Sequence, residues 1–217
     1  MSSHKRLSLT LLPLLATLLS GTAAIAAAPA PAAPALWAAD PATSSLEFQF
    51  VQAGAETTGK FARFTANIDF NPADLAHARF DVAMDVASGD TSDKERDDVL
   101  RGADLFNTAT YPRATYVATQ FAAKGASYEA QGKLTLRGVT RDVPLSFSFQ
   151  PGAEAGKPVA TLKGTAKIKR LAFGVGQGDW KSTEWVSDDV QISFSLLLRP
   201  RATAPAIPAR STPAQSK

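Results

Sequence analysis

The side chains that most often act as nucleophiles, bases or metal ligands are scarce in this 217-residue sequence, which has no cysteine and two histidines. Serine catalysis usually needs a histidine base within hydrogen-bond reach. His4 lies in a segment that we expect to be removed, which leaves His77, beside the turn-forming residues 71–74, as a solvated loop histidine. The sequence therefore predicts no catalytic residue and no tight metal site.

Acidic residues gather in one run, where paired carboxylates could share acid–base work or bind a cation. The run lacks the every-second-residue spacing and central glycine of a calcium loop, and Lys94 and Arg96 offset its charge. We therefore predict a short surface helix over residues 91–100. The acidic residues of the run are Asp90, Asp93, Glu95, Asp97 and Asp98.

Local contacts of this helix can also be predicted. Thr91 or Ser92 is expected to cap it, with acidic residues in the first turn favoured by the helix dipole. Asp97 is expected to pair with Arg96 or Arg101 as a structural contact.

A glycine-rich segment, Gly174 to Gly178, superficially resembles loops that cradle phosphate. Such loops need a preceding strand and a following helix. Here Asp179 and Trp180 follow and a final strand comes next, so we predict a mobile connection between strands. Its glycines would let it move over an adjacent cavity mouth.

The elements that must position these residues are strands, because hydrophobicity alternates with a period of two. Eight such segments occur: 46–50, 64–70, 80–86, 116–121, 128–136, 143–149, 162–168 and 190–196. An open sheet of this kind would leave two edges ready to aggregate, whereas closure removes both. We predict an all-β fold, an eight-stranded antiparallel barrel with one short helix.

Large apolar residues concentrate on the inferred inward faces of these strands. The aromatic ones are Phe48, Phe50, Phe64, Phe80, Phe147, Phe149 and Phe194, and the aliphatic ones include Ile68, Val82, Met84, Leu134 and Leu136. An eight-stranded barrel has room for side chains or for one small ligand. These residues therefore either fill an ordinary core or line an apolar tunnel, and the pattern alone does not choose.

Both ends of the chain differ in composition from the domain at 36–199. Residues 1–26 combine a positive start, an apolar run and small residues, which predicts a cleaved signal peptide. Residues 27–35 predict an Ala/Pro tether, and residues 200–217 predict a disordered Pro-rich tail. Cleavage lowers the formal charge from +3 to +1 by removing Lys5 and Arg6. The domain thus lacks the clustered positive charge of a nucleic-acid-binding protein.

Several segments in order carry a family resemblance: Gly59–Phe64, Ser88–Phe106, Tyr111-Pro112, Gly132–Thr140, Ile168–Arg170 and Phe173-Gly174. Through them, the chain from Trp37 to Leu198 resembles the YceI-like proteins, exported bacterial barrels of lipocalin-like shape. The resemblance implies a hydrophobic tunnel that holds a polyisoprenoid or related amphiphile. It also implies a mouth shaped by Leu105, Phe106, Phe173 and Trp180.

The chain departs from many family members at two positions. Ser44 and Val99 stand where those relatives have histidines, so any contact of such histidines with a ligand's polar end is missing here. The segment from Trp180 to Trp185 is similar to relatives found beside, or fused to, membrane b-type cytochromes. This similarity implies a link to quinones, which carry isoprenoid tails.

The leading hypothesis is a non-enzymatic periplasmic carrier or reservoir for an isoprenoid lipid or quinone, with no cofactor apart from the bound lipid. The alternative is an accessory module that docks on a membrane b-type cytochrome through the basic tail and the Trp180–Trp185 segment. A lipid hydrolase is the weakest hypothesis because no nucleophile–base pair is visible. The sequence leaves a homodimer open.

Overall fold

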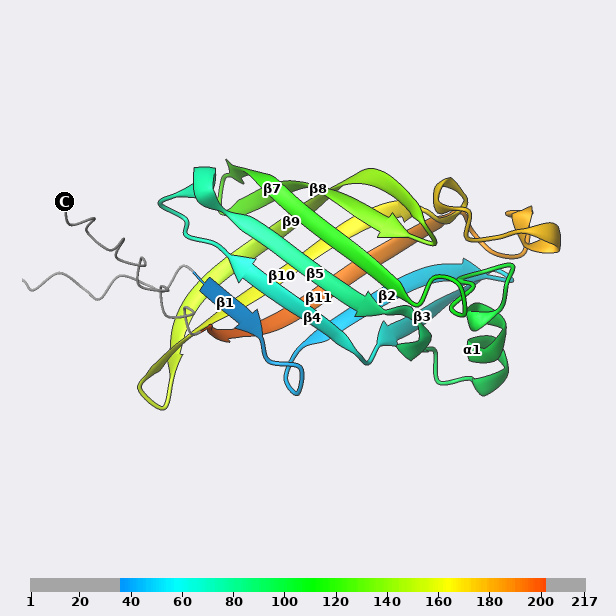
Figure 1. Cartoon of the computed structure of the whole chain (residues 1–217), viewed down its shortest axis with the longest axis horizontal. Coiled ribbons are helices and arrows are strands. Elements are labelled where there is room, and N and C mark those ends of the chain that lie inside the picture. Colours follow the sequence, from blue (N-terminus) through cyan, green and yellow to red (C-terminus); the bar gives the residue numbers. More distant parts are fainter. Residues whose placement is uncertain (1–35, 202–217) are drawn as a thin grey trace, which may run out of the picture. The chain divides into compact units, whose positions relative to one another are not determined.

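The computed structural model describes residues 36–201, which form an antiparallel β-structure with one α-helix (Figure 1). Predicted features at 1–35 and 202–217 lie outside the described residues. The strands are β1 (Leu36–Ala39), β2 (Ser45–Gln52), β3 (Ala55–Phe61), β4 (Phe64–Asp69), β5 (Arg79–Asp85), β6 (Gly89–Asp90), β7 (Arg113–Lys124), β8 (Ser127–Leu136), β9 (Val139–Glu154), β10 (Lys157–Lys169) and β11 (Asp189–Pro200). The helices are α1 (Lys94–Arg101) and the 3-10 turns η1 (Leu75–His77), η2 (Val86–Ser88), η3 (Arg170–Phe173) and η4 (Gly178–Lys181).

The sheet closes into a barrel because β1 pairs with both β4 and β11. The ring runs β1-β4-β5-β7-β8-β9-β10-β11, so the predicted eight-stranded antiparallel barrel is confirmed. Closure leaves no unpaired edge within this ring.

A second layer of pairing extends the barrel at one end. β11 pairs with β1 near its C-terminal end and with β2 over Gln191–Ser195. β3 pairs with β2 and β6 with β3, so these short strands and α1 surround the end opposite Pro200 (Figure 1). The sequence did not reveal β3, since Ala-Glu-Thr-Thr-Gly-Lys-Phe has no alternation of apolar residues.

The predicted inward faces agree with burial along the strands. In β2, Leu46, Phe48 and Phe50 are buried, and in β4 the same holds for Phe64 and its inward neighbours. Burying each large apolar side chain stabilises the fold by about 1.5–3 kcal/mol. This repeated gain fixes the register, because a slip by one residue would expose the whole apolar set.

The local contacts expected around α1 are wrong in two respects. The helix begins after Asp93, whose carboxylate accepts a hydrogen bond of 3.0 Å from the Arg96 amide, so neither Thr91 nor Ser92 caps it. Asp97 is buried and accepts from both the amide and the hydroxyl of Thr91, each at 2.8 Å. The carboxylate therefore ties the segment before the helix to the helix instead of pairing with an arginine.

Arg101 connects α1 to the barrel by hydrogen bonds. Its guanidinium donates to the carbonyls of Ala87 and Gly89, each at 3.0 Å, and to Asp98. These bonds fix α1 against η2 and β6 and so position the helix at this end of the barrel.

An aromatic cluster fills the other end of the barrel. Its ring centroids lie 4.7–6.2 Å apart, mostly edge to face, an arrangement that favours aromatic packing beyond simple burial. We call this cluster the aromatic plug, and it consists of Trp37, Phe70, Phe80, Phe121, Tyr128, Phe147 and Phe149.

Among residues 36–201, no helix is long and apolar enough to cross a membrane.

Candidate functional site

Two cavities lie inside the barrel between the aromatic plug and the end bearing α1. The outer chamber has a volume of about 110 Å³ and reaches the surface beside Val99, which is 43% exposed. Its apolar lining comes from the β2–β3 hairpin, α1, the following loop and the ends of β8, β10 and β11. The principal lining residues are Phe48, Phe50, Phe61, Leu100, Leu105, Phe106, Leu136, Ile168, Val175, Trp180, Val186 and Val190.

The inner chamber, of about 70 Å³, lies within the closed ring of strands. Its lining residues include Phe64, Ile68, Phe80, Val82, Tyr116, Val143, Leu145, Leu162, Phe194 and Leu196. Four further side chains line both chambers: Leu46, Met84, Leu134 and Ile192. The chambers are therefore neighbours that share these four side chains in their walls.

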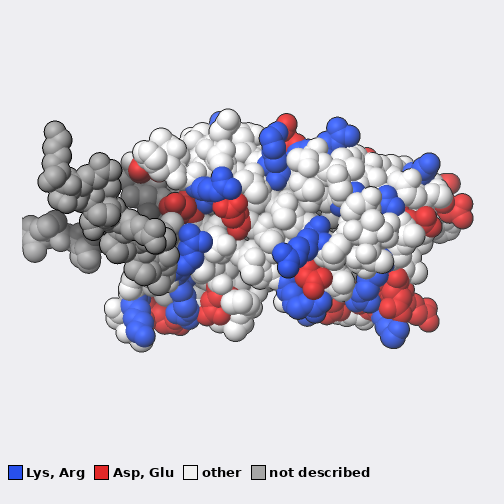
Figure 2. All heavy atoms as spheres, in the orientation of Figure 1, with Lys and Arg blue, Asp and Glu red and all other residues white. Residues whose placement is uncertain are grey.

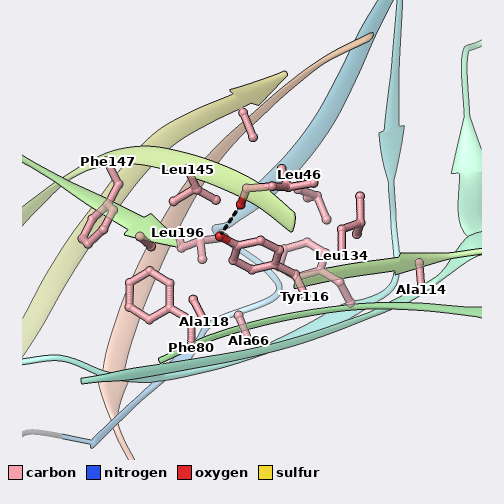
Figure 3. Close-up of a cluster of buried hydrophobic side chains, with 14 of the residues drawn as sticks. Leu46, Ala66, Phe80, Ala114, Tyr116, Ala118, Leu134, Leu145, Phe147 and Leu196 are labelled. Carbon is pink, nitrogen blue, oxygen red and sulfur yellow. Dashed lines mark hydrogen bonds between the residues drawn. The ribbon is translucent and has the colours of Figure 1, made fainter. Parts of the chain in front are cut away.

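The aromatic plug closes the inner chamber. Phe80 lines the inner chamber and also packs against Phe147, with ring centroids 5.1 Å apart (Figure 3). Figure 3 shows Phe80 and Phe147 together at one end of the buried cluster, and Leu134 toward the other. Phe80 therefore forms the part of the inner chamber's wall that meets the aromatic plug.

Three rings along the chamber walls pack over glycines on neighbouring strands. Phe48 lies opposite Gly59 and Phe194 opposite Gly164, and a Cβ at either glycine would overlap the ring. Tyr116 covers Gly132 in the same way. Glycine at these positions lets each ring lie close to the wall, so the interior keeps open space that a larger residue would fill.

The hydroxyl of Tyr116 is the polar group of the inner chamber. It donates to the carbonyl oxygen of Val143 at 3.0 Å (Figure 3). Burial raises the pKa of this hydroxyl above its ordinary value, so it remains neutral over the physiological range. With this bond made, the inner chamber presents apolar surface to an occupant.

Arg170 supplies the framework of the outer chamber. Although it is buried, its guanidinium donates five hydrogen bonds of 2.7–3.0 Å to backbone carbonyls, those of Val175, Trp180, Ser182, Val186 and Ser187. Desolvation lowers the pKa of Arg170, and the negative charge of Asp188 acts in the opposite direction. One side chain thereby holds together the loop between β10 and β11 that covers the chamber.

The glycine-rich segment belongs to this covering loop. The amides of Gly176 and Gln177 donate to the Asp104 carbonyl at 2.9 and 2.8 Å, and Arg137 donates to the Gly174 carbonyl at 2.9 Å. A Cβ at Gly176 would collide with the Arg170 guanidinium. The glycines therefore permit close packing of the loop on its neighbours.

Thirteen of the sixteen residues predicted to contact a ligand line one or both chambers. The outer chamber contains Phe48, Phe50, Leu105, Phe106, Leu136 and Trp180 from this set, the inner one Phe64, Ile68, Phe80, Val82 and Phe194, and both contain Met84 and Leu134. The other three, Phe147, Phe149 and Phe173, line neither chamber. Phe147 and Phe149 belong to the aromatic plug, and Phe173 is buried in η3, whereas Leu105, Phe106 and Trp180 of the predicted mouth line the outer chamber.

Several lining residues were not among those predicted. Phe61 lies in β3, the strand that the sequence did not reveal. Val186 and Arg170 flank irregular segments that have no alternation of apolar residues from which burial could be predicted. Gln52 could have been found, since it continues the inward series of Leu46, Phe48 and Phe50 in β2.

The remaining chemical candidates lie outside the chambers. The His77 side chain is 84% exposed and pairs with Asp74 at 2.8 Å, as expected for a solvated loop histidine. Within residues 36–201, no three histidine or acidic side chains gather as metal ligands. Figure 2 shows basic and acidic side chains interspersed on the face in view.

Comparison with known proteins identifies the family of this barrel. The YceI-like domain model matches residues 37–198. The chain belongs to the YceI-like family. The domain is a binding-domain fold, and its boundaries agree with those of the barrel described above.

YceI-like relatives match over the whole domain or part of it. Protein YceI of Escherichia coli O17:K52:H18 is 39% identical over 119 residues, which are 54% of this chain and 62% of the relative; the chain thus spans about three fifths of the curated relatives it matches. Among solved structures, Burkholderia cenocepacia BcnA is 38% identical with a TM-score of 0.68, covering 73% of this chain and 98% of BcnA. A domain from Saccharophagus degradans, described as polyisoprenoid-binding, shares the fold at 18% identity, a TM-score of 0.58 and coverage of 77% and 99%.

Proposed function

We propose that the protein is a periplasmic carrier or reservoir that holds the tail of an isoprenoid lipid, such as a prenol or prenyl quinone, without covalent chemistry. The observation that carries this proposal is the pair of adjoining apolar chambers inside the barrel. The YceI-like fold and its likeness to a polyisoprenoid-binding domain support the same class of ligand. The periplasmic location rests on the signal-like composition of residues 1–26.

The shape and chemistry of the chambers suit a long, branched hydrocarbon chain. Each 100 Å² of ligand surface removed from water contributes about 2.5 kcal/mol, which must exceed the cost of ordering the chain. The shared residues, among them Met84 and Leu134, have several rotamers and can part to join the chambers around a chain. The ligand would enter beside Val99 and end at Phe80.

The test is native mass spectrometry of the exported protein purified from its own envelope, followed by extraction and identification of any bound organic molecule. A stoichiometric prenyl lipid would support the proposal, and the same spectrum would report monomer or homodimer. Protein that carries no lipid and takes up none from prenol or prenyl-quinone micelles would overturn it. In that case, the phenylalanines would serve the stability of the fold alone.

A second candidate, favoured by a different observation, is docking on a membrane b-type cytochrome. Trp185 is 69% exposed in the loop covering the outer chamber, and such aromatic residues are enriched at binding surfaces. The basic C-terminal tail cannot begin at the same surface as this loop, because β11 separates them. From Asp189 to Pro200 this strand spans roughly 36 Å. The docking contact would thus centre on the loop.

This candidate is tested by capture of the cytochrome with wild-type protein and with Trp185→Ala, in parallel with a chain ending at Arg201. Loss of capture with Trp185→Ala alone would support docking through the loop. Equal capture by all three proteins would exclude the loop and the tail as the contacts.

A further inference from the structure

The inward face of β2 changes character along its length. Leu46, Phe48 and Phe50 are apolar, and the next inward residue is Gln52. Leu46 lines both chambers, whereas Gln52 lines the outer one. At about 3.3 Å per residue, the amide lies roughly 20 Å farther along the strand, toward the hairpin tip.

The side-chain amide oxygen of Gln52, Oε1, is shielded from solvent and has no hydrogen-bond partner within residues 36–201. A buried acceptor in this state costs free energy that a donor would recover. Arg137 Nε is the other unpartnered buried side-chain atom in the described part of the chain, and Arg137 lines neither chamber. Gln52 is therefore distinguished by combining an unmet acceptor with a place in the cavity wall, and a turn of its amide would bring the covered oxygen to the chamber.

The other two polar side chains of the outer chamber are already engaged. Arg170 makes five bonds to carbonyls, and Arg96 lies 3.6 Å from the Asp93 carboxylate. Neither needs an uncharged donor from a ligand, because both are donors themselves. The unmet requirement of the chamber is thus for one hydrogen-bond donor near the hairpin end of β2.

We propose that Gln52 accepts a hydrogen bond from a hydroxyl on the polar end of the ligand. This inference rests on the proposed function, and it narrows the ligand class to prenols and prenyl quinols. The tail lies in the inner chamber against Phe80, and the head group lies in the outer chamber. A prenyl hydrocarbon or a quinone, which offers acceptors without a hydroxyl donor, binds less well.

The test compares three ligands that share one C20 prenyl chain: geranylgeraniol, its methyl ether and the corresponding hydrocarbon. Each is titrated into the exported chain as wild type, as Gln52→Met, and as Gln49→Met. Gln49 lies on the outer face of the same strand and pairs with Glu56, so its variant is a matched control. Displacement of a fluorescent lipid gives the dissociation constants.

We expect wild type to bind the alcohol about five- to tenfold more tightly than the ether. Gln52→Met is expected to abolish that preference while binding the hydrocarbon at least as tightly, and Gln49→Met to retain it. The wild-type comparison of alcohol with ether needs no variant and stands even if a variant folds poorly.

The inference would be overturned, with the carrier function left intact, by equal binding of alcohol and ether by wild type or by an alcohol preference that survives Gln52→Met. Tighter binding of the ether would likewise overturn it, because the amide nitrogen would then be the group that meets the ligand. Failure of all three ligands to bind would instead overturn the proposed function, and this inference with it.

Discussion

Phe48 in β2 lies directly opposite Gly59 in β3, and its ring occupies the space that a side chain at Gly59 would take. The ring therefore packs along the wall of the outer chamber. The pair couples a feature of sheet pairing to the volume available inside the barrel. Phe194 and Gly164 form a second such pair, and Tyr116 packs over Gly132 from a diagonal position.

Replacing Gly59 with alanine should therefore reduce ligand capacity. The new Cβ displaces the Phe48 ring into the outer chamber, and overpacking of this kind costs about 1–3 kcal/mol of stability. We expect prenol affinity to fall at least about tenfold, measured by displacement of a fluorescent lipid at a temperature where the variant is folded. Gly152→Ala is the control, since a Cβ there meets Val159 at an ordinary 3.8 Å. Unchanged affinity in Gly59→Ala would show that the ring moves elsewhere.

Shortening Phe80 should deepen the pocket. Phe80→Ala removes the ring between the inner chamber and Phe147, at a cost of about 3–5 kcal/mol in the free energy of unfolding. The ratio of affinities for a long and a short prenol should shift toward the long one. Leu100→Ala, in the outer chamber, should weaken both prenols without this shift. An unaltered ratio in Phe80→Ala would mean that the chain does not reach the plug.

Loss of the Arg170 guanidinium should loosen the covering loop. Arg170→Gln leaves several carbonyls without their donor, and we expect a loss of at least about 3 kcal/mol in stability. Hydrogen exchange should rise in the loop around Val175 and Val186 before it rises in β8. Arg141→Gln, which removes one exposed bond to the Ala172 carbonyl, is the control. Equal exchange in both variants would contradict a special role for Arg170.

Acid should weaken the seam where β1 meets β11. A hydrogen bond from Arg199, 2.9 Å long, is the main reason that the pKa of Asp40 is lowered, assisted by the Ala42 amide. Because the folded pKa lies below the unfolded value of about 3.9, this stabilisation is complete above that pH and is lost as the pH falls through the folded pKa. The urea midpoint should therefore drop less between pH 6 and pH 2.5 in Asp40→Asn than in wild type. Parallel curves for the two proteins would contradict this contribution.

The sequence was sufficient to predict the barrel because the period of two reports directly which face of a strand is buried. Long strands such as β9 and β10 repeat the pattern often enough to be unmistakable. Short strands cannot be predicted in this way, because they contain too few residues to show the alternation. β1 has four residues and β6 two, and they form because neighbouring strands offer unpaired backbone groups.

The sequence was enough to predict which face of each strand points inward, but not where each inward residue lies along the barrel axis. Alternation places Phe64 and Phe147 on the same inner surface, yet one lines a chamber and the other belongs to the plug. Their separation depends on the stagger between strands, which no local pattern contains. The role of Arg170 was equally hidden, since its partners are carbonyls of irregular segments and carry no sequence signal.

The pairing of Trp37 with Pro200 brings both ends of the barrel domain to the plug. Leu36 and Arg201 therefore both lie at the plug end of the barrel, and Val99 lies at the opposite end. A linker, an affinity tag or a solid support attached at either end of the barrel domain would therefore be joined at the plug end and would leave the end that bears α1 accessible to ligand. Cargo could then enter and leave freely while the protein itself stays fixed in place.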